Sequence, residues 1–458
     1  MQLNLAQIAR WLGVDVPPHS AAVPISGIST DSRTIRPGEL FVPLRGARFD
    51  GHHYLPLAVA NGAAACLSAE PFKADIPVIV VADTLVALGD IASGWRHFFK
   101  LPVVAITGSC GKTTTKEMLA EILTGTGPGL KTAGNYNNLI GLPLTLLRLT
   151  ARDQWAVVEL GMNRRGEISR LTEIAAPDFG VITNIGPGHL EGLGDLEGVA
   201  RAKGELFVRL LPGSVAVVNA DDERIVSLPV ANGVEKISFG LSASATVRAT
   251  ELVADETGYR FLLQMGGRQW PVTLHVAGRH NVHNALAAAA VADQLHVSVE
   301  QIVAGLERFR PAAGRMAWTV CAPGWSLLED YYNANPLSMS AALSTLAEAG
   351  GRRIAVLGDM LELGSESSLM HHEIGAYAAA CVDQLVVLGA FAEDVVGGAM
   401  SAGLDASKII CVTDHREAFE QLCTLLRRGD RVLIKGSRGM QMEKIAELLR
   451  GYTPVEGA

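Results

Sequence analysis

The sequence predicts a three-domain α/β protein, in which a small N-terminal α/β domain precedes a central phosphate-binding domain and a C-terminal Rossmann-like domain. Three observations support this prediction. A chain of 458 residues is too long for one hydrophobic core. Short apolar runs recur between helix-length segments, which is typical of a doubly wound, mostly parallel sheet. One of these runs leads directly into a Gly-rich turn that begins a helix.

The composition limits the classes of function. Thirty-nine Lys and Arg against 47 Asp and Glu give a net charge of -8, without a block of like charges. This balance argues against nucleic acid as a partner. Residues 1–13 lack a signal-peptide core, and no apolar run reaches membrane-spanning length. Six scattered cysteines indicate reduced thiols. We therefore expect a cytoplasmic protein without membrane insertion, and we expect a monomer.

The N-terminal domain is predicted over residues 1–100. From Thr30 to about Lys100, short apolar segments alternate with turn-rich pieces such as Phe49, Asp50 and Gly51. This pattern favours a small α/β domain. It contains no Gly-x-Gly-x-x-Gly, so nothing in it indicates a dinucleotide fingerprint.

The central domain is predicted over residues 101–312. Buried-type strands are expected at 103–107, 155–160, 179–183 and 215–219. Between about Val234 and His275, short alternating segments with Gly turns predict antiparallel strands appended to the sheet. A helix pair from Asn281 to Arg310 ends the domain.

The C-terminal domain is predicted over residues 313–458. It follows the Pro-, Ala- and Gly-rich segment 309–315, which suits a hinge. Strands are expected at 326–329, 353–357, 384–388, 408–412 and 431–435, alternating with helices. That alternation predicts a second domain of nucleotide-binding type.

The run after the strand 103–107 predicts a triphosphate site, built from Gly108, Ser109, Cys110, Gly111, Lys112, Thr113 and Thr114. A helix N-terminus and a Gly-rich turn direct amides at one point, which is what a polyphosphate needs. Lys112 adds a positive charge for the β- and γ-phosphates, and Thr113 offers a hydroxyl to Mg²⁺. The alternative is an ordinary strand-to-helix turn.

Two later strand ends carry further candidates. Glu159 ends one strand and is placed to complete a magnesium site with Thr113, because strand carboxyl ends meet at one edge of such a sheet. His189 follows the strand 179–183 and reaches the same edge. The alternatives are a solvated carboxylate for Glu159 and a structural histidine for His189.

Taken together, these motifs resemble the Mur ligases, which build the peptide of bacterial peptidoglycan. The loop from Gly134 to Asn138, with Gly141, Pro143 and Leu144, looks like the family's acceptor-side loop. Ala202 to Glu205 looks like the segment that carries its modified lysine. The resemblance implies ATP, two Mg²⁺ ions and a carbamylated Lys203, which would act with Lys112 and His189 in catalysis. A carbamate offers Mg²⁺ an anionic oxygen, whereas an ammonium group would repel it. The alternative is an unmodified surface lysine.

The same resemblance implies nucleotide contacts from both sides of the hinge, by Asn281, Asn284, Arg315, Asp330, Tyr332 and Asn333. Asn281 has an alternative role in capping a helix. The family usually has a small residue where Tyr331 stands, which leaves the local packing open. The run from Asp330 to Pro336 has an Asn-Pro turn as its alternative.

The substrate contacts implied by the resemblance come from all three domains: Ser29, Asp31, Ser32, Arg33, Asn135, Asn137, Asn138, Asn335, Lys435, Ser437 and Arg438. Within the family, the absence of Gly-x-Gly-x-x-Gly and of Asp-Asn-Pro-Arg favours the branch that joins D-alanyl-D-alanine to UDP-N-acetylmuramoyl-tripeptide. The run Gly358 to Gly364 and the run Lys435 to Met440 are also similar to that branch. Either diaminopimelate or lysine fits as third residue of the tripeptide.

The implied reaction passes through an acyl phosphate. Two other functions share parts of this pattern. Folylpolyglutamate synthase shares the central architecture but has no need of the extra N-terminal domain. An ATP-binding regulatory or transport module would leave Glu159, His189 and Lys203 without a shared purpose.

Overall fold

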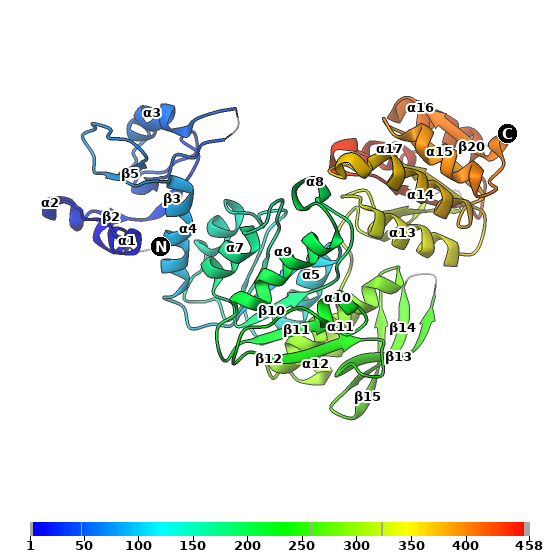
Figure 1. Ribbon diagram of the computed structural model, residues 1–458, viewed down its shortest axis with the longest axis horizontal. Helices are drawn as coiled ribbons and strands as arrows, with labels where there is room; N and C mark the ends of the chain where they lie inside the picture. The colour runs from blue at the N-terminus through cyan, green and yellow to red at the C-terminus, as the bar shows by residue number, and fades with distance from the viewer. Residues whose placement is uncertain (1–2, 47, 256–257, 322–323, 453–458) are drawn as a thin grey trace.

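The computed structural model describes residues 3–46, 48–255, 258–321 and 324–452. Within these residues the chain forms three main β-sheets and one two-stranded ribbon (Figure 1). The main sheets use strands between residues 27 and 80, 103 and 274, and 317 and 435. The predicted boundaries at residues 100 and 312 therefore fall between sheets. The predicted α/β class and the mostly parallel central sheet are confirmed.

The described part of the N-terminal unit has a four-stranded parallel sheet in the order β3-β4-β5-β6 and a ribbon of β1 and β2. Its strands are β1 (Leu3–Asn4), β2 (Pro24–Ile25), β3 (Gly27–Ser29), β4 (Glu39–Phe41), β5 (Ala65–Ser68) and β6 (Val78–Val80). Its helices are α1 (Leu5–Leu12), α2 (Pro18–Ala21), α3 (Leu55–Ala60) and α4 (Thr84–Arg96).

The described residues of the central unit form a nine-stranded sheet in the order β15-β14-β13-β12-β11-β10-β7-β9-β8. Its strands are β7 (Val103–Thr107), β8 (Leu130–Lys131), β9 (Ala156–Glu159), β10 (Phe179–Ile182), β11 (Val215–Asn219), β12 (Glu235–Gly240), β13 (Val247–Ala254), β14 (Tyr259–Met265) and β15 (Arg268–Leu274). Its helices are α5 (Lys112–Leu123), α6 (Gly141–Leu146), α7 (Glu167–Ala175), α8 (Leu190–Leu193), α9 (Leu196–Arg209), α10 (Glu223–Val226), α11 (Arg279–Gln294) and α12 (Val299–Arg308).

Strand β7 is buried on both faces because two cores meet across the sheet. Val104 and Ile106 belong to the core shared with α5 and α11, whereas Val103 and Ala105 belong to the core shared with α4, α7 and α9. Alternate side chains of a strand point to opposite faces, so a strand covered on both sides must be apolar throughout. This double cover fixes β7, and with it the loop that follows.

The appended strands differ in part from the prediction of antiparallel pairing over 234–275. Strands β12 and β13 continue the parallel sheet next to β11, and the antiparallel pairs among the described strands of the central sheet are β13–β14 and β14–β15. The parallel pairing of β12 and β13 covers two residue pairs, so it extends the sheet by a short contact before the β13–β15 meander. Alternating polarity in the sequence indicated strands but could not give their direction.

The described C-terminal residues form a six-stranded sheet in the order β16-β17-β21-β18-β19-β20. Its strands are β16 (Ala317–Cys321), β17 (Trp325–Glu329), β18 (Arg353–Leu357), β19 (Gln384–Leu388), β20 (Ile409–Val412) and β21 (Arg431–Lys435). Its helices are α13 (Pro336–Glu348), α14 (Ser367–Ala379), α15 (Ala392–Ser401), α16 (His415–Leu425) and α17 (Glu443–Arg450). Strand β16 was not predicted. It is an antiparallel edge strand whose Val320 is 81% exposed, so it lacks the buried apolar run of the others.

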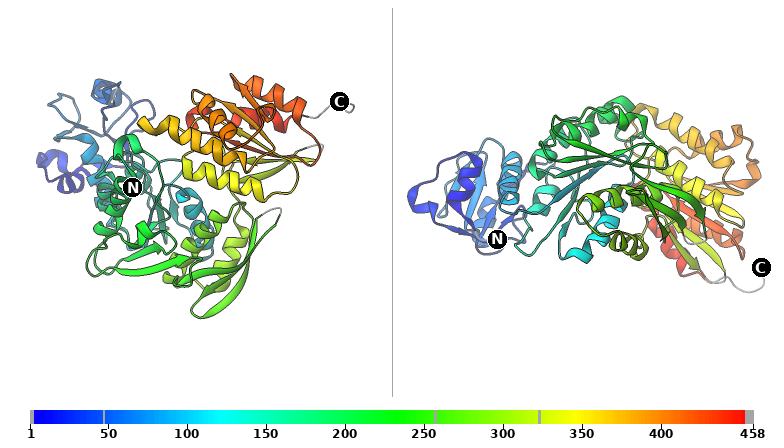
Figure 2. Two further views of the ribbon diagram at one scale, coloured as in Figure 1. Left: turned by 45° about the vertical axis from the view of Figure 1, so that its right-hand side comes forward. Right: turned by 90° about the horizontal axis from the view of Figure 1, so that it is seen from below.

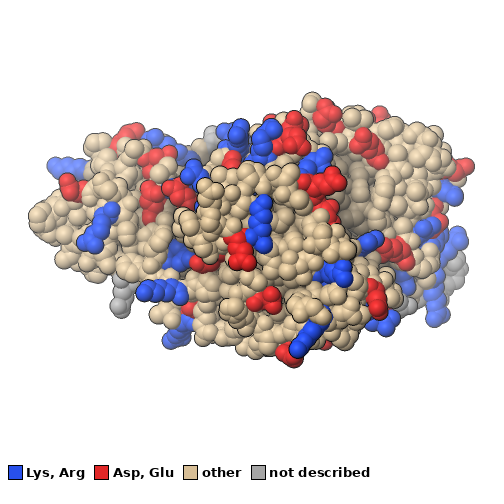
Figure 3. Space-filling view, turned by 60° about the horizontal axis from the view of Figure 1, so that its bottom comes forward, with Lys and Arg blue, Asp and Glu red and all other residues tan. Residues whose placement is uncertain are grey.

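The N- and C-terminal units lie on opposite sides of the central unit (Figures 1 and 2). Helix α4 carries the chain onto the central unit, where its Asp90 pairs with Arg170 of α7 at 2.5 Å. On the face drawn in Figure 3, acidic and basic side chains are intermingled, so charge does not mark out a binding surface there. In the part of the chain that the structure describes, no helix has both the length and the apolar character to cross a membrane.

Candidate active site

The loop between β7 and α5 requires glycine at two positions. Gly111 has φ +83°, and a Cβ there would lie 2.3 Å from Asn284 Oδ1. At Gly108 a Cβ would lie 1.9 Å from Thr183 Oγ1. The loop is therefore pressed between α11 and the end of β10, which leaves its amides and the N-terminus of α5 pointing into one site.

The segment after β10 holds the loop in place. The Cys110 amide donates to Asn184 Oδ1 at 2.8 Å, and Asn184 Nδ2 donates back to the Cys110 carbonyl at 3.0 Å. Ser109 Oγ donates to the Gly186 carbonyl at 2.8 Å. These bonds make this more than an ordinary strand-to-helix turn, because a second strand end is tied to it.

The side chain of Lys112 folds back over the phosphate loop. Its Nζ donates to the Gly108 carbonyl at 2.6 Å. Burial lowers the pKa of Lys112, and the nearby Glu159 carboxylate opposes that shift. The ammonium group is thus held over the loop, where a β- or γ-phosphate would lie.

Glu159, the last residue of β9, is 1% exposed, so the solvated alternative for this carboxylate was wrong. Its Oε1 lies 3.1 Å from Nζ of Lys116 and makes no hydrogen bond. Lys116 is itself 1% exposed and donates to the Thr132 carbonyl at 2.7 Å. Lys116 was not among the predicted site residues, although it stands one helical turn after Lys112 on the same face of α5.

Lys203 of α9 is 2% exposed, which excludes the surface-lysine alternative. Burial, and then the charge of Lys112, hold the pKa of Lys203 well below its ordinary value. Among the described residues, no carboxylate lies within ion-pair distance of its Nζ. A buried lysine without an anionic partner favours the neutral amine.

His189 follows β10 in a left-handed conformation with φ +56°. Its Nδ1 lies 2.8 Å from Oε2 of Glu362, which comes from the C-terminal unit. Burial lowers the pKa of His189, the Glu362 carboxylate opposes that shift, and Lys203 and Lys112 add to it. The histidine therefore stands beside both lysines at the edge of the central sheet.

These side chains suit a hard cation only with additional oxygen ligands. Within the described residues, no three or more His, Cys, Asp or Glu side chains gather as a ready metal site. The buried Glu159 Oε1 accepts no hydrogen bond and faces Lys116 at 3.1 Å, so it has lone pairs left for a cation. The remaining donors would be the Thr113 hydroxyl, His189, phosphate oxygens and a modified Lys203.

Two asparagines of α11, Asn281 and Asn284, lie next to the phosphate loop and the start of α5. Asn284 Oδ1 accepts from Thr115 Oγ1 at 3.2 Å, and Asn284 Nδ2 donates to Asn281 Oδ1 at 2.8 Å. Asn281 Nδ2 donates to the Ala277 carbonyl at 2.6 Å and does not cap a helix amide. Both side chains are buried, and their predicted adenine contacts stay a prediction.

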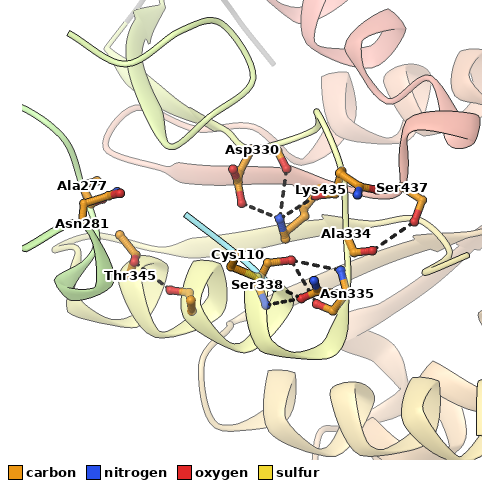
Figure 4. A network of polar contacts seen from close by, with 12 residues as sticks. Cys110, Ala277, Asn281, Asp330, Ala334, Asn335, Ser338, Thr345, Lys435 and Ser437 are labelled. Carbon is orange, nitrogen blue, oxygen red and sulfur yellow. Dashed lines mark hydrogen bonds and ion pairs between the residues drawn. The ribbon is translucent and has the colours of Figure 1, made fainter. Parts of the chain in front are cut away.

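In the C-terminal unit, Asp330 and Lys435 form a close pair (Figure 4). Lys435 Nζ lies 2.5 Å from Asp330 Oδ2 and donates to the Asn333 carbonyl at 3.0 Å. Ser437 Oγ donates to the Ala334 carbonyl at 3.2 Å. These bonds to Asp330 and Asn333 fix the 330–334 loop. Lys435 is 1% exposed, and its contact with substrate stays a prediction.

Asn335 links the C-terminal unit to the phosphate loop (Figure 4). It caps α13 in a reciprocal pair with Ser338, so the Asn-Pro run is the start of a helix rather than a plain turn. Its Oδ1 also accepts from the Cys110 thiol at 3.2 Å, and its Nδ2 donates to the Ser109 carbonyl at 3.5 Å. The two units therefore meet directly over the loop.

The tyrosine pair after β17 has two separate roles. Tyr331 is buried, its hydroxyl donates to Glu329 Oε2 at 2.8 Å, and its ring packs against Gly314. The unusual residue at 331 thus fills the space beside the hinge. Arg315 stacks on Tyr332, with its guanidinium carbon 3.8 Å from the ring centre. Arg438 lies 5.9 Å from the same ring and pairs with Glu443 at 3.0 Å.

The predicted acceptor-side loop borders Glu159. The Gly161 amide donates to the Asn137 carbonyl at 2.8 Å. Asn138 Oδ1 accepts from the amides of Ile140 and Gly141 at 3.1 and 2.9 Å, just before α6. Asn135 is exposed. This loop lies next to the carboxylate but outside the sheet.

The N-terminal candidates lie at the end of β3, far from the phosphate loop in sequence and in Figure 1. Arg33 pairs with Asp31 at 2.6 Å, and their hydrogen bond lowers the pKa of Asp31 to about 2. Ser29 Oγ accepts from the Asp31 amide at 3.2 Å, and the buried Ser32 accepts from Asn61 through its carbonyl at 2.9 Å.

A cavity of about 510 Å³ lies in the same unit. It is lined by Arg45, Gly46, Arg48, Phe49, Asp50, His53 and Tyr54. This stretch was predicted only as a turn. The signal that could have indicated a site is the mixture of arginine and aromatic side chains around Asp50, which is suited to a phosphorylated or aromatic group.

Comparison with known proteins extends over nearly the whole chain. Models of the Mur ligase family match residues 24–96 (catalytic domain), 106–292 (middle domain) and 314–438 (glutamate ligase domain). The UDP-N-acetylmuramoyl-tripeptide--D-alanyl-D-alanine ligase of Escherichia coli is 39% identical over 98% of this chain and 99% of its own length.

Two solved structures are similar over almost their full length. MurF from Acinetobacter baumannii is 37% identical with a TM-score of 0.90, covering 98% of this chain and 99% of its own. MurF ligase from Thermotoga maritima in complex with ADP is 28% identical with a TM-score of 0.85, covering 93% and 97%. The match spans all three units and the segments that meet at the phosphate loop, and the chain belongs to the Mur ligase family.

Proposed function

We propose that the chain is an ATP-dependent ligase that joins D-alanyl-D-alanine to UDP-N-acetylmuramoyl-tripeptide. The observation that carries this proposal is the convergence of Lys112, Glu159 and the buried Lys203 at one edge of the central sheet. The 39% identity to a ligase of that name over almost the full length supports the choice of substrates.

The loop amides and Lys112 hold the β- and γ-phosphates of ATP. The terminal carboxylate of the tripeptide attacks the γ-phosphorus, the bond to the β-phosphate oxygen breaks, and ADP leaves. Lys112 neutralises the charge that spreads over the transferring oxygens. The dipeptide amine then attacks the acyl carbon, phosphate leaves, and the amine loses a proton as the amide forms.

Thr113, Glu159, His189 and Lys203 are the residues that would hold two Mg²⁺ ions, which supply positive charge to the phosphates. We propose that Lys203 acts as a carbamate. Its neutral amine attacks carbon dioxide, a nitrogen–carbon bond forms, and a proton leaves, so a cation-repelling ammonium becomes an anionic oxygen ligand. Its depressed pKa and its lack of an anionic partner support this assignment.

The N-terminal unit would bind the uridine diphosphate part, through the Ser29–Arg33 turn and the adjoining 510 Å³ cavity. Tyr54, which lines the cavity, lies close enough to interact with the charge of Arg33. A cytoplasmic site of action agrees with six free cysteines and with the use of ATP.

The test is phosphate release from ATP and Mg²⁺ with UDP-muramoyl-tripeptide, measured with and without D-alanyl-D-alanine, with Lys112→Ala as the inactive reference. We expect release to depend on the dipeptide. Release that is independent of it would contradict the proposal. Release that requires folate and glutamate would favour the folate enzyme, which has no use for the N-terminal unit.

A further inference from the structure

The loop from Gly358 to Gly364, between β18 and α14, has no role in the function described so far. It is firmly built. The buried Asp359 accepts from the amides of Ala390 and Phe391 at 2.8 and 3.1 Å. The Met360 amide donates to His371 Nε2 at 2.8 Å, and the Leu361 amide donates to Ser437 Oγ at 2.9 Å. The loop is therefore a rigid part of the C-terminal unit.

Glu362 projects from this loop toward the central unit. Its φ is +64°, and the φ of His189, which it meets at 2.8 Å, is +56°. Left-handed backbone is unfavourable for a non-glycine residue and persists where tertiary contacts impose it. A second contact lies beside it, because a Cβ on Gly364 would stand 3.4 Å from Glu191 Cα. Two left-handed positions from separate units thus meet at one close ion-pair contact.

The chemistry of the pair is specific. An imidazole binds a cation through one ring nitrogen, and the partner of the other nitrogen decides which one carries the proton. Because a Glu362 carboxylate oxygen lies 2.8 Å from Nδ1, a proton on Nδ1 is favoured and the Nε2 lone pair is left available. The side chains of His189 and Glu362 are 34% and 61% exposed, and an ion pair of that exposure contributes little stability. The pair is better explained by orientation than by stability.

We propose that Glu362 is a positioning residue that fixes the ring orientation and tautomer of His189 for cation binding when the C-terminal unit docks. Docking of the third unit and assembly of the metal site are then one event. This inference rests on the proposed metal role of His189. It gives the Gly358–Gly364 loop a function at a distance from its own domain.

The test measures Mn²⁺ affinity by electron paramagnetic resonance on the full chain with ADP, relative to ADP alone. The variants are Glu362→Ala, Glu362→Gln, His189→Asn and the control Glu366→Ala, which removes an exposed carboxylate after the same loop. We expect Glu362→Ala to weaken Mn²⁺ binding by roughly 10-fold or more. The Mn²⁺ affinity of Glu362→Gln should lie between those of Glu362→Ala and the unaltered chain, because an amide oxygen can still accept from Nδ1. Glu366→Ala should match the unaltered chain.

A second readout separates positioning from a general loss of structure. In histidine-labelled protein, long-range ¹H–¹⁵N spectra should show the Nδ1–H tautomer for His189 and its loss in Glu362→Ala. Unchanged Mn²⁺ affinity in Glu362→Ala, with weakened affinity in His189→Asn, would overturn this inference alone. Unchanged affinity in His189→Asn would overturn both it and the proposed metal role.

Discussion

At the scale of single residues, the phosphate loop depends on glycines, because their positions leave no room for a side chain. Gly111 combines φ +83° with a Cβ position 2.3 Å from Asn284 Oδ1, whereas Gly213 has φ +90° and nothing within 4 Å of its Cβ position. Both glycines therefore have a positive φ, but only Gly111 has a neighbouring atom close to its Cβ position. Comparing them separates conformational strain from the fit of the loop against α11.

Gly111→Ala should lower kcat/KM for ATP by roughly 100-fold or more, because the loop must move away from Asn284 and the phosphate contacts shift. Gly213→Ala should cost about 1 kcal/mol of stability and leave kcat/KM unchanged. Steady-state kinetics and thermal unfolding of the two variants check this. Equal activity in both would mean that the loop tolerates the displacement.

Lys203 gives the second prediction at this scale. Lys203→Ala should lower kcat by roughly 100-fold or more, because an anionic ligand to the metal is lost. Added formate or acetate should restore part of the activity by filling the space. Arg201→Ala, an exposed change on the same helix, is the control and should show no response to these acids. Full activity of Lys203→Ala would rule out the carbamate.

At the scale of elements, Arg96 joins α4 to the end of α7. Its side chain donates to the carbonyls of Ala175, Ala176 and Phe99 at 3.1, 3.2 and 3.0 Å, and Arg96 is 7% exposed. The last carbonyls of a helix have no partner within it. A guanidinium with several donors meets that need and ties the N-terminal unit to the central one.

Arg96→Met should leave one buried and two partly buried carbonyls without this donor and cost about 2–4 kcal/mol. The midpoint of the first thermal transition should fall by roughly 5 °C or more. Arg165→Met, at an exposed position, should stay within about 0.5 kcal/mol of the unaltered chain. A similar effect from both variants would show that the carbonyls are satisfied in another way.

At the scale of the whole molecule, the C-terminal unit docks on the central unit through contacts that respond to acid. Burial lowers the pKa of His280, at the start of α11, from 6.5 to about 4, while Asp330 of the C-terminal unit opposes the shift. Between these two values the unfolded chain binds a proton that the folded chain does not. Stability should therefore fall as the pH drops from about 6.5 to about 4.

His280→Gln should make thermal unfolding less sensitive to acid, with a drop in Tm between pH 7.5 and 4.5 that is smaller by roughly 2 °C or more. His19→Gln, which changes an exposed histidine of the N-terminal unit, is the control and should keep the full drop. Differential scanning calorimetry across this pH range is the measurement. Parallel curves for His280→Gln and the unaltered chain would place the acid sensitivity elsewhere.

The hinge belongs to this scale as well. Gly314, with φ +71°, packs against the Tyr331 ring, and the Tyr332 amide donates to the Gly314 carbonyl at 3.1 Å. Because ATP would lie between the central and C-terminal units, we expect the C-terminal unit to close about residues 311–314. The contacts of Asn335 with the phosphate loop are consistent with it.

The sequence by itself determined the features that depend on local order along the chain. The apolar runs of β7, β18 and β21 predicted strands because a strand covered on both faces must be apolar throughout. The Gly108–Thr114 loop was predictable because a strand, a glycine turn and a helix follow one another directly. The loop chemistry around Lys112 follows from that order alone.

Only the tertiary structure decided which distant residues meet and in what environment. The partner of Glu159 is Lys116, the partner of His189 is Glu362 from another unit, and Tyr331 packs on the hinge. Burial of Lys203 and the parallel direction of β12 and β13 were equally inaccessible. The physical reason is that desolvation and side-chain pairing depend on packing between segments up to hundreds of residues apart, and no local pattern in the chain records that packing.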